Sequence, residues 1–67
     1  MAKIQLNGKK ITIRSKETIY DLLKKLKLNN RKVAIEHNGI IIPKTCYKKK
    51  YLKNNDKLEI VHFIGGG

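Results

Sequence analysis

This chain has one cysteine, one proline, no tryptophan and only five acidic residues among its 67. The single cysteine, Cys46, excludes an internal disulfide framework and a thiolate metal cluster, which favours a reducing compartment such as the cytoplasm or a plastid stroma. No apolar run is longer than Ile40–Ile42, far below the roughly 20 residues of a membrane-spanning helix. The alternating stretch Met1–Leu6 is not typical of a signal peptide. We therefore expect one soluble domain with a marginal core and little room for an internal active site.

The scarcity of acids leaves a formal charge of +11, which is compatible with a nucleic-acid partner. Two features argue against that partner. Arginine, the better ligand for phosphate and guanine, occurs only at Arg14 and Arg31. Of the aromatic side chains, only Phe63 is predicted on the sheet, where bases would stack. A small basic nucleic-acid-binding domain stays the alternative from another functional class.

Two short segments near the N-terminus alternate in polarity and are joined by Asn7-Gly8, the strongest short signal for a β-hairpin. The strands are expected at 3–7 and 10–14. Their apolar side chains would share one buried face: Ile4, Leu6, Ile11 and Ile13.

The period then changes to that of a helix. Apolar residues recur with helical spacing at Ile19, Leu22, Leu23 and Leu26. Thr18 is a suitable N-cap, and Asp21 three residues later resembles the acid of a capping box, with a shorter side chain. Asn29-Asn30 is the predicted end of the helix, because asparagine tolerates the left-handed conformation.

The rest of the chain predicts three further strands. Residues 33–37 form the third strand, 40–42 a short strand ended by Pro43, and 57–64 the last. Residues 44–53 form a crossover with one helical or 3₁₀ turn. Its Lys48–Lys50 run is either a solvated face or a surface that steers the protein toward acidic partners.

This order of strands and helix predicts an α+β domain: a ubiquitin-like β-grasp fold with a mixed sheet of four to five strands and one main helix on one face. A right-handed crossover places the last strand beside the first.

The last strand carries the first candidate site. Leu58 and Ile60 are expected to face the helix, because the opposite register would bury Glu59. Val61 and Phe63 then lie on the open face of the sheet, where exposed apolar side chains mark a protein partner. We assign Val61, Phe63 and Ile64 to this partner interface.

Three glycines, Gly65, Gly66 and Gly67, follow the strand and form the second candidate site. Glycine contributes no packing and loses the most entropy when it is ordered. A flexible tail without side chains, residues 65–67 after a domain at 1–64, can enter a narrow channel and present its carboxylate. A carboxylate reacts with nucleophiles only after an oxygen becomes part of a leaving group, which adenylation by ATP accomplishes. The tail is therefore predicted to be a substrate of an activating enzyme.

The sequence resembles the ThiS family, the ubiquitin-like sulfur carriers of thiamine biosynthesis. The similarity rests on "IQLNG" at 4–8, "TIYDLL" at 18–23, "VAIEHNG" at 33–39 with Ile42-Pro43, and "EIVHFIGGG" at 59–67. The Lys48–Lys50 run and "NND" at 54–56 depart from the usual family pattern.

The resemblance implies a role for each tail glycine. Gly67 is the modified residue, Gly66 is the other member of the terminal Gly-Gly pair, and Gly65 lengthens the flexible tail. A ubiquitin-activating-enzyme-like adenylyltransferase uses ATP and magnesium on Gly67, a cysteine desulfurase supplies the sulfur, and the resulting thiocarboxylate donates it to thiazole synthase. The carrier itself binds no cofactor and is expected to be a monomer when free.

Three alternatives stay open within and beside this prediction. A carrier for molybdopterin synthesis or tRNA thiolation shares the terminal Gly-Gly, and so does a ubiquitin-like modifier. A third alternative is that Cys46 relays sulfur, but a lone cysteine in a loop is more often incidental. No acids are spaced for catalysis, and His37 and His62 lack the further ligands of a metal site. The chain is therefore predicted to be neither an enzyme nor a metal protein.

Overall fold

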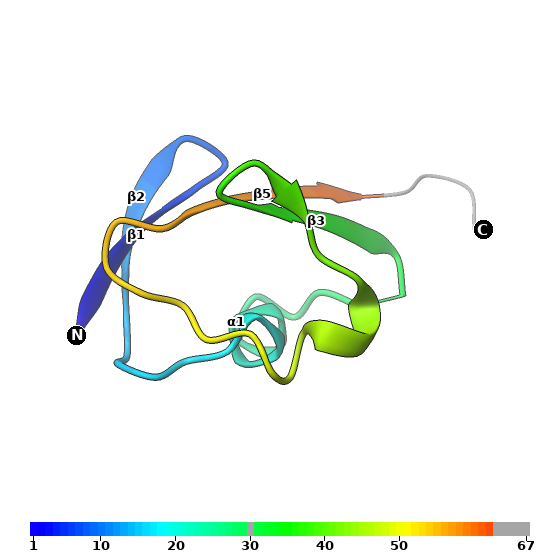
Figure 1. The fold of residues 1–67 in the computed structure, drawn as a ribbon, viewed down its shortest axis with the longest axis horizontal. Helices are drawn as coiled ribbons and strands as arrows, with labels where there is room; N and C mark the ends of the chain where they lie inside the picture. The colour runs from blue at the N-terminus through cyan, green and yellow to red at the C-terminus, as the bar shows by residue number, and fades with distance from the viewer. Residues whose placement is uncertain (30, 63–67) are drawn as a thin grey trace.

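The computed structural model of the protein describes residues 1–29 and 31–62. Five strands form one mixed sheet in the order β2-β1-β5-β3-β4. The strands are β1 (Ala2–Leu6), β2 (Lys9–Ile13), β3 (Val33–His37), β4 (Ile40–Ile41) and β5 (Lys57–His62). Helix α1 (Ile19–Lys25) packs on one face of the sheet (Figure 1). The predicted α+β architecture is confirmed.

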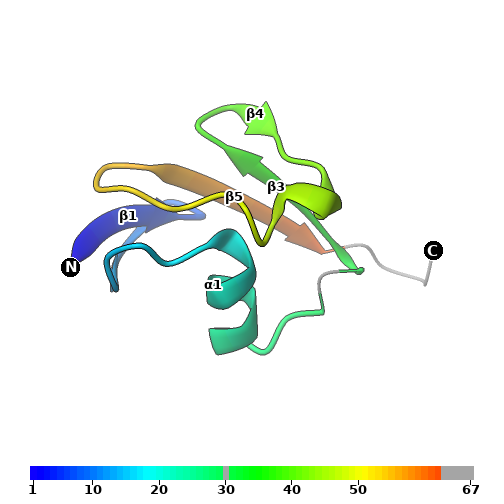
Figure 2. The same ribbon diagram turned by 60° about the horizontal axis from the view of Figure 1, so that its bottom comes forward.

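Strand β5 occupies the centre of the sheet. It pairs in parallel with β1, where Leu58 lies opposite Leu6, and antiparallel with β3, where Ile60 lies opposite Ile35. Figure 2 shows β5 running between β1 and β3. The predicted position of the last strand beside the first is therefore correct.

Both Asn-Gly turns have the backbone that their sequence demands. Asn7 and Gly8 have φ values of 49° and 83°, and Asn38 and Gly39 have 53° and 84°. These left-handed conformations are typical of the tight turns that connect twisted antiparallel strands. The hairpin signal at Asn7-Gly8 thus fixed the register of β1 against β2, with Ile4 opposite Ile11.

Helix α1 begins as predicted and ends earlier. The Thr18 hydroxyl accepts a hydrogen bond from the Asp21 amide at 3.1 Å, and the Asp21 carboxylate accepts one from the Thr18 amide at 3.1 Å. The predicted end at Asn29-Asn30 is wrong, because Lys27 adopts φ 57° and stops the helix after Lys25. The amides of Lys27 and Leu28 donate to the carbonyls of Lys24 and Leu23, as in a Schellman motif.

This early end changes which leucine is buried. Leu26, predicted on the buried stripe, is 40% exposed, whereas Leu28 packs against the core after the turn. The described helices, of seven and three residues, are too short to cross a membrane.

The core lies between the sheet and α1, and the crossover completes it. The 3₁₀ helix η1 (Lys44–Cys46) confirms the predicted turn in this segment. Tyr47, at its end, is 1% exposed, and its carbonyl accepts a hydrogen bond from the Tyr20 amide. The crossover is therefore attached to the start of α1 through both its backbone and a buried aromatic ring. The buried apolar residues are Ala2, Ile4, Ile13, Ile19, Leu22, Leu23, Val33, Ile35, Tyr47, Leu52 and Leu58.

A buried polar cluster fixes the start of β5. Oδ2 of Asp56 lies 2.7 Å from Nε2 of His37 and accepts a hydrogen bond from the Lys53 amide at 2.8 Å, while Oδ1 accepts one from the Asn38 side chain at 3.1 Å. Asn38 also accepts from the Lys57 amide at 2.8 Å. His37, considered from sequence only as a metal ligand, instead ties the β3–β4 turn to β5.

The cluster predicts a pH-dependent stability. Burial raises the pKa of Asp56, but the hydrogen bonds from His37, the Lys53 amide and Asn38 lower it by more, so the pKa lies below its ordinary value. The ionised carboxylate therefore stabilises the fold fully at neutral pH, and this contribution is lost as the pH falls below about 4, the ordinary pKa of aspartate.

We expect Asp56→Asn to lower the melting temperature at pH 7 and to flatten its decline between about pH 5 and pH 2. Thermal unfolding followed by circular dichroism across this range measures both effects. A variant that loses stability in acid as steeply as the wild type would contradict this role for Asp56.

Candidate functional site

The alternation along β5 separates a core face from an open face. Leu58 is 1% exposed and Ile60 is half-buried against the core, as predicted. Glu59 and Val61 are exposed on the opposite face, and Val61 keeps 57% of its surface accessible. The prediction that Val61 lies on the open face is confirmed. The other predicted site residues, Phe63, Ile64, Gly65, Gly66 and Gly67, lie outside the described residues.

Val61 belongs to an exposed apolar surface that extends across three strands. It lies opposite Ala34 on β3, and Ile41 on β4, 72% exposed, lies next along the sheet opposite Glu36. We call Ala34, Ile41 and Val61 the apolar patch. Together with Ile35, Glu36 and Glu59 these residues line a shallow hollow. Sequence reasoning assigned residues 40–42 to a strand but did not place Ile41 beside Val61, because strand order and register are tertiary properties.

Asn7 holds β5 beside this surface. Its side-chain oxygen accepts a hydrogen bond from the Ile60 amide at 2.7 Å, and its side-chain nitrogen donates to the Ile60 carbonyl at 3.2 Å. The Asn7 backbone amide donates to the Leu58 carbonyl at 2.9 Å. The amide side chain thus continues the β1–β5 ladder beyond the end of β1. From sequence Asn7 was only a turn residue, since its partner is 53 positions away.

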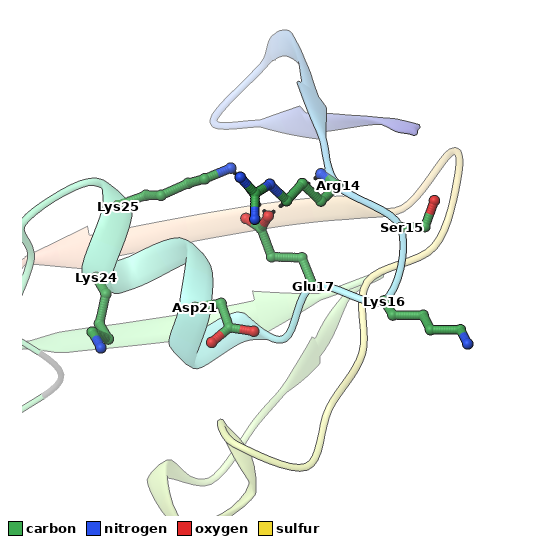
Figure 3. A pocket seen from close by; sticks show the side chains of 7 residues that line it. All are labelled: Arg14, Ser15, Lys16, Glu17, Asp21, Lys24 and Lys25. Carbon is green, nitrogen blue, oxygen red and sulfur yellow. Dashed lines mark hydrogen bonds and ion pairs between the residues drawn. The ribbon is translucent and has the colours of Figure 1, made fainter.

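A second hollow lies between the β2–α1 loop and α1 (Figure 3). Its lining residues are Arg14, Ser15, Lys16, Glu17, Asp21, Lys24 and Lys25. The buried Glu17 carboxylate accepts a hydrogen bond from Nζ of Lys25 at 3.0 Å and a longer one from the Arg14 amide at 3.4 Å. Asp21 serves the helix cap. Both acids are therefore engaged in holding the loop and helix together.

The described residues contain no group of three or more His, Cys, Asp or Glu side chains that could bind a metal ion. Cys46 is a partly exposed free thiol on η1. Of the tyrosines, Tyr47 is in the core, and Tyr20 lies beneath Nζ of Lys48 at 4.7 Å from the ring centre. None of the described aromatic residues lies in a sheet strand, so the described part of the sheet offers no platform for stacking bases.

Comparison with known proteins gives the chain a family. The ThiS family model matches residues 3–67, and a sulfur carrier protein ThiS from Bacillus subtilis is 45% identical over 96% of this chain and 98% of its own length. A thiazole synthase from Paramagnetospirillum magneticum is 43% identical over 97% of this chain. The chain spans only 20% of that synthase.

Solved structures agree with the sequence relatives. The crystal structure of a thiamine biosynthesis protein (ThiS) from Geobacter metallireducens superposes with a TM-score of 0.83 at 28% identity, covering 97% of this chain and 99% of the other. The central β5, the mixed sheet and the single helix define a ubiquitin-like β-grasp domain. The chain belongs to the ThiS family, whose members are small sulfur carrier proteins and not catalysts.

The Asn7 contacts predict a specific loss of order in β5. Asn7→Gly keeps the left-handed turn but removes both side-chain hydrogen bonds, so we expect unfolding to become easier by about 1–2 kcal/mol. Relative to wild type, hydrogen exchange at the Ile60 amide should accelerate more than exchange at the core amides of β1, because the Ile60 amide loses its acceptor.

Asn55→Gly is the matched control for this substitution. Asn55 also has a positive φ, 72°, and its side chain forms no hydrogen bond with the described residues. We expect Asn55→Gly to leave both the stability and the Ile60 exchange close to wild type. Equal effects of the two substitutions in urea unfolding and exchange would show that glycine entropy, and not the lost amide, is responsible.

Proposed function

We propose that this protein is the sulfur carrier of thiazole formation in thiamine biosynthesis, with Gly67 as the modified residue. Its C-terminal carboxylate is adenylated and then converted to a thiocarboxylate, which donates its sulfur to the thiazole ring. The observation that carries this proposal is the family match, because it extends over residues 3–67 and so includes the three glycines.

The partners and cofactors follow from this chemistry. A ubiquitin-activating-enzyme-like adenylyltransferase consumes ATP and magnesium, a cysteine desulfurase provides the sulfur, and thiazole synthase accepts it. Two relatives that are themselves named thiazole synthase contain a segment similar to this chain, which supports the synthase as a partner. One free cysteine suits a reducing compartment, and we place the reactions in the cytoplasm or a plastid stroma.

Chain length supports docking through the open face. Gly67 is the sixth residue after Val61, so an extended chain spans no more than about 22 Å between them. Any enzyme that takes Gly67 into its active site therefore lies close to Val61. We propose Val61, Phe63 and Ile64 as contact residues in these complexes, with Gly65 and Gly66 recognised inside the channel.

The test is mass spectrometry of a Cys46→Ser protein after incubation with the adenylyltransferase, ATP and a sulfur source. Exchange of oxygen for sulfur has nearly the same mass as addition of oxygen, so the sample is also treated with a thiol alkylator. We expect one alkylated group, located at Gly67 in the C-terminal peptide and absent when Gly67 is deleted. The substitution at Cys46 removes the only other thiol.

Other outcomes assign a different function. A tail that stays unmodified with partners that load a known carrier would contradict the proposal. Isopeptide adducts on other proteins would indicate a ubiquitin-like modifier. A loaded chain that molybdopterin synthase or a tRNA thiolation enzyme accepts, and thiazole synthase refuses, would place the carrier in another pathway.

A further inference from the structure

The acidic residues of this basic protein divide into two groups. Three of the five are used inside the fold: Glu17 pairs with Lys25, Asp21 caps α1, and Asp56 binds His37. Glu36 and Glu59 have no hydrogen bond or ion pair with any residue in the described ranges. Their negative charge therefore has no structural use in this part of the chain.

Glu36 and Glu59 also lie where they cost stability. They are directly opposite each other in the β3–β5 ladder, and both are exposed on the open face. Like charges facing each other across two strands repel and destabilise the sheet. Lys57, two residues before Glu59 on the same face, forms no ion pair with either one among the described residues. A charge arrangement that weakens the free protein is explained by a partner that neutralises it.

The pair adjoins the apolar patch. Glu36 lies opposite Ile41 in one direction and Glu59 in the other, and Val61 follows Glu59 on the same face. Both glutamates line the shallow hollow with the patch residues. At this end of the open face, an exposed apolar surface thus adjoins two of the five acidic residues of a chain whose net charge is +11. Lys10 and Lys57 occupy the neighbouring row of the same face, on either side of Gln5.

We propose that Glu36 and Glu59, together with the apolar patch, form a docking surface for basic and apolar side chains of the adenylating enzyme. This inference rests on the proposed function. An enzyme that holds ATP carries a positive potential at its active site, where lysine and arginine neutralise the phosphates. A carrier of charge +11 is repelled there, and the glutamate pair lowers this repulsion where the carrier meets the enzyme. The reach from Val61 to Gly67 brings the glutamate pair to the mouth of that site.

The test measures adenylation of the carrier by ATP–pyrophosphate exchange, with Glu36→Gln/Glu59→Gln compared to wild type. The KM for the carrier should rise about tenfold, as for loss of a close interfacial charge pair, with kcat unchanged. The melting temperature of the free double variant should rise by roughly 1–5 °C, because the repulsion is removed. A double variant that is more stable when free and binds the adenylating enzyme more weakly would show that the two charges act in binding and not in folding.

Lys3→Gln/Lys57→Gln is the matched control, since it removes two exposed charges of the opposite sign from the neighbouring strands of the sheet. Its KM should stay equal to wild type or fall. An unchanged KM for the glutamate double variant would overturn the inference while wild-type adenylation still supported the carrier function. Normal adenylation with impaired transfer to thiazole synthase would assign the surface to the synthase and so contradict the proposal. Failure of the wild type to be adenylated would contradict the proposed function itself.

Discussion

The position of β5 in the centre of the sheet is the constraint on which the rest of the structure depends. This strand pairs with β1 from one end of the sequence and β3 from the middle, so it forms only when the whole sheet forms. The buried Asp56 cluster fixes its start, and the Asn7 side chain holds it at Ile60. The strand that precedes the C-terminal glycines is therefore held by two neighbouring strands, by the Asp56 cluster and by the Asn7 side chain.

Such an architecture suits a protein whose chemistry takes place inside other proteins. Its small core contains Leu58, Tyr47 and the buried face of α1. The buried acids Glu17 and Asp56 pair with Lys25 and His37, and the exposed Asp21 caps the helix. What is left for function is one open sheet face and the sequence that follows it. In the function we propose, the carrier supplies a rigid platform and a carboxylate, and its partners supply activation, sulfur and the ring-forming reaction.

The sequence predicted the elements that local patterns determine. The Asn7-Gly8 hairpin, the Thr18 cap and the exposure of Val61 follow from turn chemistry, capping and alternation, and the structure confirms each. The helix end was missed because Lys27 adopts a conformation that glycine or asparagine normally takes. The pairing of Asn7 with Ile60, of His37 with Asp56, and of Glu36 with Glu59 depends on register between distant strands, which a single sequence does not encode in any short pattern. Glycine and carboxylate chemistry predicted a tail that an activating enzyme uses as substrate, the resemblance to a family added the sulfur, and this chemistry is a proposal.

The most direct test of this account is chemical-shift mapping of the ¹⁵N-labelled carrier during titration with its adenylating enzyme. We predict changes at the tail glycines and on the open face, at Ala34, Ile41 and Val61, while Tyr20 on α1 and Lys48 in the crossover stay unchanged. Changes concentrated on α1 and the crossover, with the open face unaffected, would contradict it.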